Sequence, residues 1–224
     1  GGTTATLAAV QTKSADFSIA DVNDLASALG GKFGYRQALP DLRLVLNILP
    51  FALGIIVRKD SDIKSVADLK GLRYPVGWQA FPNGVPLSRG VLASAGLGLK
   101  DLVGVPTSGL IPAANDFKAG KSDATLTAAG APMVAEINAA IRGGVRFLSL
   151  EKSAKNLARI KKIRPEYDFM TLKPSPRLAG VVGTTNFLRV DLTIVTATHV
   201  PDATVYKFVK AMYENKKDLV KGHP

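Results

Sequence analysis

The sequence predicts an α/β fold in which mostly parallel sheets are covered by helices. Short runs of apolar and β-branched residues alternate with stretches of helical spacing, and this order is typical of parallel sheets. Glycine or proline stands at most of the boundaries between them. The chain has 224 residues, 46% of them hydrophobic and 21% charged, so it can bury a sizeable core in one large domain or two small ones.

The alternation begins at the first residues of the chain. A helix is expected to follow Gly1–Thr4, and Pro50 should divide a long apolar stretch into two strands. A short helix further on has clear signals, since Ser65 can cap it, Asp68 follows three residues later and Gly71 can end it. In order, the expected elements are a helix over 4–12, a strand over 16–21, a helix over 22–30, strands over 42–49 and 54–60, and a helix over 65–71.

The remainder of the chain continues the same pattern. Pro86 and Pro132 lie in the first turns of expected helices, where proline is well tolerated, and Gly96 and Gly120 should end helices. The expected strands cover 73–78, 102–107, 122–130, 145–151 and 192–197, and the expected helices cover 85–96, 111–120, 131–144 and 153–163, with a last helix from about 201.

Composition argues against a metal or cofactor site. The chain has no cysteine, which excludes disulfides, thiolate catalysis and zinc–thiolate centres. Its two histidines, His199 and His223, are too few for a histidine-rich site. Carboxylate pairs such as Asp60 and Asp62 lack the density of oxygen ligands that a calcium loop needs. We therefore expect no metal and no cofactor.

The sequence also offers little for catalysis. No G-x-S-x-G, Walker A or G-x-G-x-x-G motif is present. A Ser–His pair could use only His199 or His223, and the first of these looks like a surface residue just before a helix. The prediction is that the protein is not an enzyme.

A net charge of +11 raises the question of an anionic partner, which could be nucleic acid, a membrane surface or an acidic small ligand. The densest basic cluster spreads around one expected helix, which favours a solvated face, and it lacks the interleaved aromatic residues that stack on bases. The longest apolar stretch, 44–57, is too short to span a bilayer. We expect neither nucleic-acid binding nor stable membrane insertion. The cluster consists of Lys152, Lys155, Arg159, Lys161, Lys162 and Arg164.

Three expected helix N-termini suggest an anion-binding site. Small or polar residues precede the helices that start after Gly1–Thr4, after 77–83 and after 127–130. Helix N-termini present free N–H groups and a partial positive charge, and in parallel sheets ligands bind beyond the carboxyl ends of strands. Ordinary capping explains each end alone, but three ends that converge would hold an anion without any catalytic group.

Several stretches resemble a known family of receptors. "GIIVRKDSDIKSVADLKGLRYPVG" is similar to the hinge strand and DLKG turn of type II periplasmic solute-binding proteins. More specifically, the chain resembles the TAXI family of TRAP-transporter-associated extracytoplasmic receptors. That resemblance covers essentially the whole chain and rests on "GGTTATL", "ADFSIADVNDLASA", "KAGKSDATLTAAGAPMVAEI", and "GGVRFLSLE" followed by "VPDATVYKFVKAM".

The resemblance implies a two-lobed Venus-flytrap protein with a ligand in the cleft between two α/β lobes. Residues 1–53 with 192–224 should form lobe I, and 54–191 should form lobe II. The family captures a small organic solute in the periplasm and delivers it to the membrane subunits of a TRAP-type permease, so a small organic anion, a carboxylate or an amino acid, is the expected ligand. Compared with the family, the chain is expected to lack parts of the first lobe, and it shows no leader peptide.

The resemblance also indicates which residues should bind the solute, with some departures. Thr3 or Thr4 takes the place of a serine, and Asn23 takes the place of an aspartate, which removes a negative charge. The usual glycine- and serine-rich turn is replaced by Trp78–Asn83. The expected ligand-binding residues are Thr3, Thr4, Asn23, Trp78, Gln79, Phe81, Asn83, Thr127 and Gly130.

Trp78, the only tryptophan, has two interpretations. It can plug the core, or it can form a platform on which a planar or apolar part of the solute stacks, and we favour the platform. Two other functions remain open for the chain as a whole. One is an enzyme on the same two-lobed fold, and the other is a cytoplasmic ligand-sensing module of a regulator.

Overall fold

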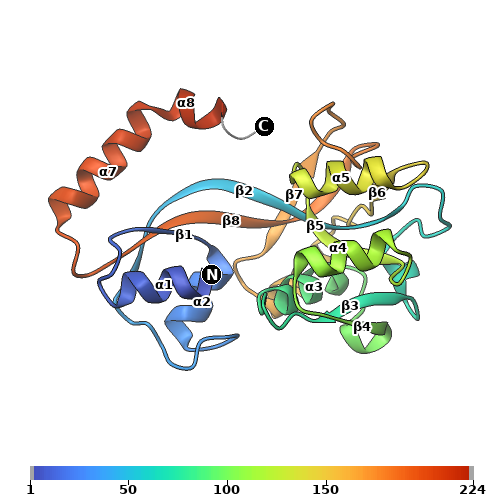
Figure 1. Cartoon of the computed structure of the whole chain (residues 1–224), viewed down its shortest axis with the longest axis horizontal. Coiled ribbons are helices and arrows are strands. Elements are labelled where there is room, and N and C mark those ends of the chain that lie inside the picture. Colours follow the sequence, from blue (N-terminus) through green and yellow to red (C-terminus); the bar gives the residue numbers. More distant parts are fainter. Residues whose placement is uncertain (1–2, 222–224) are drawn as a thin grey trace. The chain divides into compact units, whose positions relative to one another are not determined.

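The computed structural model describes residues 3–221 and divides the chain into two compact units. Unit 1 combines Gly1–Pro50 with Asp191–Pro224, and unit 2 is Phe51–Val190. The boundary falls within two long strands, β2 (Leu42–Arg58) and β8 (Thr185–Ala197), which are drawn in light blue and orange in Figure 1. That these units act as the two lobes of a receptor stays a prediction.

Unit 1 is a small helix-on-sheet assembly. Strand β1 (Ser18–Asp21) pairs antiparallel with β8, and α1 (Thr3–Gln11) and α2 (Val22–Gly30) pack beside it. Asp21 caps α2 and Gly31 ends it in the left-handed conformation, as the glycine pair predicts. The hydrophobic cluster of this unit contains Leu7, Val10, Ala20, Leu25, Ala28, Tyr35, Leu39, Leu42, Val195 and Ala197.

Two further helices complete unit 1, and among their described side chains none is fully buried. They are α7 (Asp202–Glu214) and α8 (Lys216–Lys221). The apolar side chains of α7 follow helical spacing at Val205, Phe208, Val209 and Met212, yet each is only half-buried. Phe208 stacks on Phe17 with ring centroids 4.3 Å apart. Helix α7 therefore buries little apolar area against the rest of its unit.

Unit 2 carries most of the helices and strands, and the expected alternation is confirmed there. In chain order it contains η1 (Val66–Leu69), β3 (Arg73–Gly77), α3 (Gly84–Ala93), η2 (Leu99–Asp101), β4 (Val103–Thr107), α4 (Leu110–Lys118), β5 (Ala124–Ala128), α5 (Pro132–Ala140), β6 (Val145–Phe147), α6 (Ala154–Ile163) and β7 (Asp168–Leu172). Ser65 and Asp68 form the expected capping box, but the helix they begin is a short 3₁₀ helix.

The prediction of mostly parallel sheets is wrong for the main sheet. Its central order is β1-β8-β2-β5, and the pairs β1–β8, β2–β5, β2–β6 and β7–β8 are antiparallel. β3 and β4 form a parallel pair, in a separate two-stranded sheet. The alternation of strands and helices along the sequence did not reveal that β2 and β8 would each pair with two antiparallel strands.

A proline explains why the parallel pair is separate. The Asp123 amide donates to the Arg73 carbonyl at 2.9 Å, which brings the starts of β3 and β5 together. In a parallel ladder, the next bond would require an N–H at position 75, but that residue is Pro75. The ladder between β3 and β5 therefore stops after its first hydrogen bond, although the strands remain in contact.

Pro50 does not divide the apolar stretch into two strands as expected. Strand β2 is continuous over Leu42–Arg58. The φ angle that the proline ring fixes is compatible with extended backbone, and Pro50 is exposed.

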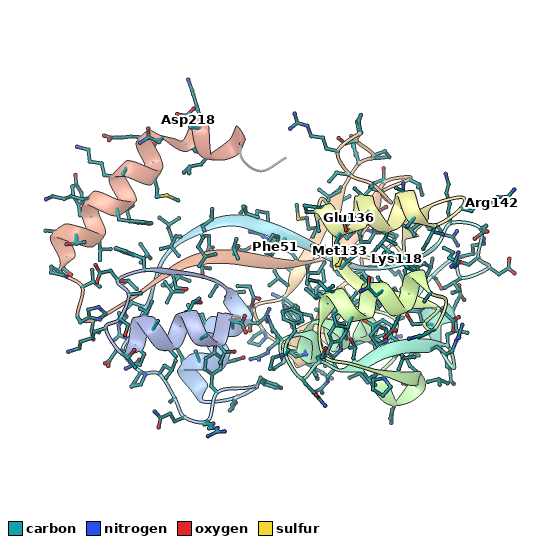
Figure 2. The ribbon with its side chains drawn as sticks, viewed as in Figure 1. Phe51, Lys118, Met133, Glu136, Arg142 and Asp218 are labelled. Atoms are coloured by element: carbon teal, nitrogen blue, oxygen red, sulfur yellow. The ribbon has the colours of Figure 1, made fainter. Side chains whose placement is uncertain are left out.

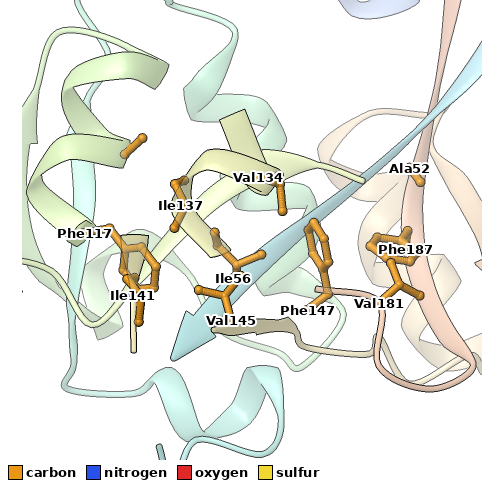
Figure 3. Close-up of a cluster of buried hydrophobic side chains, with 11 residues drawn as sticks. Ala52, Ile56, Phe117, Val134, Ile137, Ile141, Val145, Phe147, Val181 and Phe187 are labelled. Carbon is orange, nitrogen blue, oxygen red and sulfur yellow. The ribbon is translucent and has the colours of Figure 1, made fainter. Parts of the chain in front are cut away.

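A hydrophobic cluster between the helices and strands of unit 2 forms its core (Figure 3). Val134 and Ile137 of α5 and Phe117 of α4 contact it from the helices, and Phe147 packs edge-to-face on Phe187 at 5.0 Å. Gly54 lies in β2 against this pair, and a Cβ atom there would meet both rings at 3.0 Å. The cluster consists of Ala52, Ile56, Ala114, Phe117, Val134, Ile137, Ile141, Val145, Phe147, Val181 and Phe187.

Arg146 of β6 organises the turn that follows β2. Its guanidinium donates to the carbonyl oxygens of Arg58, Lys59, Ser61 and Ile63, among them Ser61 at 2.9 Å and Ile63 at 2.5 Å. Only the five-donor fork of arginine can reach four acceptors in this way. The Arg146 side chain thus supplies hydrogen bonds to carbonyl oxygens of the turn.

Candidate functional site

The candidate site lies at one edge of unit 2, where three strands end. Gly77 and Thr107 stand in register at the ends of the parallel strands β3 and β4, and β5 starts beside the start of β3. Helices α3, α4 and α5 begin within a few residues of these strand ends. The sequence predicted two of these strand–helix turns, after β3 and after β5.

The turn after β4 was missed, and it has the most available donors. Gly109 precedes α4 in a fully extended conformation, and among residues 3–221 no acceptor bonds the N–H groups of Leu110 and Ile111. The Thr107 hydroxyl donates to the Gly109 carbonyl at 3.1 Å and thereby fixes the turn. The signal in the sequence was a strand followed by Ser108–Gly109 and a helical stretch with an early proline.

In helix α3, by contrast, the first backbone N–H groups already have acceptors in the preceding turn. The Gly84 amide donates to the Phe81 carbonyl at 2.9 Å and the Val85 amide to the Pro82 carbonyl at 3.2 Å. The next residue is Pro86, which has no N–H. The expectation that 77–83 opens a helix is confirmed, but this helix offers few donors to an anion.

Trp78 is fully buried and lies flat against the start of α3. A Cβ atom on Gly84 would be 2.4 Å from the indole, so only glycine leaves room for the ring. Phe81 meets the indole edge-on at 6.1 Å, and the backbone of Trp78 has a φ of 50°. The structure thus shows Trp78 as a core plug, and a solute could stack on its ring only if this turn opened. The platform role stays a prediction.

The other expected residues of this turn differ in exposure. Gln79 is exposed and Phe81 is half-buried, so both are accessible to a solute. Asn83 is buried and stands just before α3 without capping it through its side chain. The Ala80 amide donates to the Ser108 carbonyl at 2.7 Å, which ties the turn after β3 to the turn after β4.

The third strand end holds Thr127 and Gly130. Thr127 is 3% exposed, and its hydroxyl has no hydrogen-bond partner among the described residues. Gly130 has a φ of 82°, a left-handed conformation that lets the chain turn into α5. Met133, labelled in Figure 2, lies in the first turn of that helix and packs against the core cluster. Met133 therefore makes the start of α5 apolar.

Among the expected site residues of unit 1, Asn23 lies in the first turn of α2. Asn23 is completely buried, and neither atom of its side-chain amide has a partner within residues 3–221. Asp21 accepts from the amides of Asn23 and Asp24 at 2.9 and 3.0 Å. Burial, and then the nearby charge of Asp24, raises the pKa of Tyr35. Two carboxylates thus flank Asn23, so the turn keeps negative charge although Asn23 itself has none.

Thr3 and Thr4 lie in the first turn of α1, in the same unit. Thr4 is half-buried, whereas the Thr3 side chain and Gly1–Gly2 are outside the described part of the chain. The structure therefore brings Asn23 and α1 into unit 1 and Trp78, Gln79, Phe81, Asn83, Thr127 and Gly130 into unit 2.

Neither a metal site nor a membrane span is found in the described part of the chain. No cluster of three or more histidine or acidic side chains there is suited to a metal ion. Within residues 3–221, no helix combines the length and the apolar character needed to cross a bilayer.

A family model described as the NMT1-like family matches residues 1–224. Among solved structures, one described only as a periplasmic transporter has a TM-score of 0.60 and 17% identity over 99% of this chain and 72% of its own. The amino acid ABC transporter substrate-binding protein AbpA from Streptococcus pneumoniae, bound to L-arginine, has a TM-score of 0.54 and 14% identity over 97% of this chain and 70% of its own.

A third similar structure is the periplasmic aliphatic sulphonate binding protein SsuA from Escherichia coli. Its TM-score is 0.53 at 19% identity, and the alignment covers 99% of this chain but 62% of that protein. The chain thus spans less than two thirds of that relative's length. These likenesses show the fold, which is the α/β fold of type II periplasmic binding proteins.

Proposed function

The chain belongs to the NMT1-like family, and we propose that it is an extracytoplasmic receptor for a small organic anion. The observation that carries this proposal is the start of α4, where the N–H groups of Leu110 and Ile111 have no acceptor among the described residues. Free N–H groups at a helix N-terminus favour a carboxylate or sulfonate. No acidic side chain lies between Thr107 and Asp116 to oppose it.

The chemistry of the site supports binding rather than catalysis. The residues at the three strand ends are aromatic, amide, hydroxyl or glycine, and none is a strong acid or base. Such a set can orient a solute and exclude water but cannot transfer a proton at neutral pH. Two of the similar proteins are a sulphonate-binding protein and a protein bound to L-arginine, which favours a solute with an acidic group.

We further propose where the receptor acts and which permease receives its solute. The stretches that resemble the TAXI family support a periplasmic location and delivery of the solute to the membrane subunits of a TRAP-type permease. AbpA, a substrate-binding protein of an ABC transporter, has a comparable fold, so fold alone does not distinguish the two kinds of permease. Binding of the receptor to reconstituted permease subunits of each kind would decide between them.

Calorimetry of the purified chain against a panel of acids tests the binding function. The panel contains amino acids, dicarboxylates, 2-oxoacids, aromatic acids and alkanesulfonates. We expect saturable heat with at least one acid. If no acid gives heat while the protein is folded by circular dichroism, the receptor proposal is wrong.

A charge placed at the start of α4 tests the site. Ser108→Asp adds a carboxylate next to the free N–H groups, and it should weaken anion binding by about tenfold or more, because like charges a few ångströms apart repel. Ser175→Asp adds the same charge at an exposed position elsewhere in unit 2 and should leave binding unchanged. Equal affinities in the two variants would move the site away from α4.

A further inference from the structure

Helix α6 is fixed to unit 2 by one face only. Ile160 and Asn156 are buried, and the helix contacts α3 and β7. Ser153 caps the helix by accepting from the Asn156 amide at 3.2 Å, and the Asn156 side chain donates to the Glu151 carbonyl at 3.1 Å. The orientation of α6 is therefore well determined, and so is the face that it turns to solvent.

That solvent face is entirely basic or small. Between positions 152 and 164 the chain has six basic residues and no acidic one. Lys155 and Lys162 lie about two turns apart on one side of the helix, and Lys152 precedes the N-cap residue Ser153. Arg159 is instead half-buried and donates to the Asn156 side chain at 3.1 Å. The three lysines are exposed, as are Ala154 and Ala158 between them.

These lysines differ from some basic residues elsewhere in the chain, which pair with carboxylates. Lys121 pairs with Asp116 at 3.0 Å and Lys210 of α7 with Glu214 at 3.7 Å. Within residues 3–221, no carboxylate lies within ion-pair distance of Lys152, Lys155, Lys161 or Lys162. Arg164 at the end of the helix faces Glu166 at 4.0 Å. The positive charge of the α6 face is therefore uncompensated.

The composition of this face indicates which anionic partner it fits. Specific protein interfaces are enriched in aromatic residues and arginine, and single-stranded nucleic acids need aromatic stacking platforms. The α6 face offers neither, since it presents flexible lysines separated by alanines. Such a face suits a surface over which negative charge is spread rather than a partner with a defined, complementary binding surface.

We propose that the α6 face, defined as the exposed Lys152, Lys155, Lys161 and Lys162, docks this protein on a bilayer surface that carries anionic phospholipids. Each lysine near such a surface strengthens binding by about fivefold, and the attraction is screened over about 10 Å at moderate salt. The attraction is reversible and keeps the protein close to a membrane without inserting any segment. It does not depend on the solute receptor proposed above.

Partition into lipid vesicles tests this surface. The wild-type chain is mixed with vesicles of phosphatidylglycerol and phosphatidylcholine or with vesicles of phosphatidylcholine alone, at low and at moderate salt, and bound protein is measured by sedimentation. We expect binding to the anionic vesicles only, weakened as salt rises. Lys155→Gln with Lys162→Gln should lower the partition coefficient roughly 25-fold, as two contributions of about fivefold predict.

The matched control removes the same charge from another helix. Lys207→Gln with Lys210→Gln acts on α7 and should change partition by less than about threefold, since only charges at the contact feel the full surface potential. Three outcomes would overturn the proposal. They are equal losses in the two double variants, binding to neutral vesicles as strong as to anionic ones, and no vesicle binding by a chain that binds a soluble acidic protein through the same lysines.

Discussion

Helices α5 and α7 have similar apolar spacing but very different surroundings. Val134 and Ile137 of α5 are buried in the core cluster of unit 2, whereas Val205, Phe208, Val209 and Met212 of α7 are only half-buried. Spacing therefore tells which side of a helix is apolar, but burial depends on the surface that meets it. Hydrophobic stabilisation grows with buried apolar area, so we expect stability to be concentrated in unit 2.

The largest effect should come from removing the plug of unit 2. Trp78→Ala deletes a fully buried indole that rests on Gly84 and should lower the free energy of unfolding by about 3–5 kcal/mol. Guanidinium unfolding followed by far-ultraviolet circular dichroism measures this. A loss below about 1 kcal/mol would show that the turn 77–84 is not part of the core.

Arg146→Ala should have the next largest effect. The variant leaves the carbonyl oxygens of the turn after β2 without their shared donor, which should cost about 1.5–3 kcal/mol. The fluorescence of Trp78 reports unfolding here, because it is the only tryptophan and lies in the same unit. Arg146→Lys keeps the charge but loses the fork and should recover only part of the loss; full recovery would mean that charge alone matters.

A smaller, pH-dependent effect is expected at the ion pair between Arg73 and Asp123, where the closest atoms are 2.6 Å apart. Hydrogen bonds from the Arg73 side chain lower the pKa of Asp123, so the pair stabilises the fold above the unfolded pKa of about 4 and loses this effect as pH falls through the lower folded pKa.

The partly exposed side chains limit the contribution of this pair to about 1 kcal/mol or less. The stability difference between wild type and Asp123→Asn should thus be constant above about pH 5 and should shrink below about pH 4. Urea unfolding at a series of pH values measures it. A difference that grows as the solution is acidified would contradict this assignment.

The smallest effect is expected on α7. Tyr213 is 80% exposed, and Tyr213→Ser should change stability by less than about 0.5 kcal/mol. The same urea titration can be used, with Tyr74→Phe as a buried control, since Tyr74 is 1% exposed and its hydroxyl lies 3.0 Å from that of Ser88. A loss on α7 as large as the loss at Tyr74 would show that the apolar side of α7 is covered in solution.

Local signals predicted much of the fold, and long-range pairing was not predicted. Capping residues and glycines located α2, η1 and α5, because these signals act over a few residues. The antiparallel main sheet was not foreseen, since the direction of β2 and β8 relative to their neighbours is settled by residues far away in sequence. The continuous strand through Pro50 was missed for a related reason, because proline limits strands mainly where a neighbour needs its N–H.

The candidate site was predicted in part for similar reasons. The turns after β3 and β5 contain residues that stand out, such as Trp78 and Gly130. The turn after β4 contains only Ser108 and Gly109, which are ordinary in a loop, and its free N–H groups became visible only in three dimensions. The complete burial of Trp78 depends on Gly84, and one sequence gives no sign that a glycine six residues away makes room for an indole.

The missing N–H of Pro75 has a consequence for how the protein exchanges its amide hydrogens with solvent. Because the ladder between β3 and β5 ends after the bond from Asp123 to Arg73, the β3–β4 pair can open without breaking the main sheet. Its amides should then exchange as a separate cooperative group, faster than those of β2 and β5. Since the turns that hold Trp78 and the start of α4 follow these two strands, the candidate site would be carried by a part of unit 2 that fluctuates on its own.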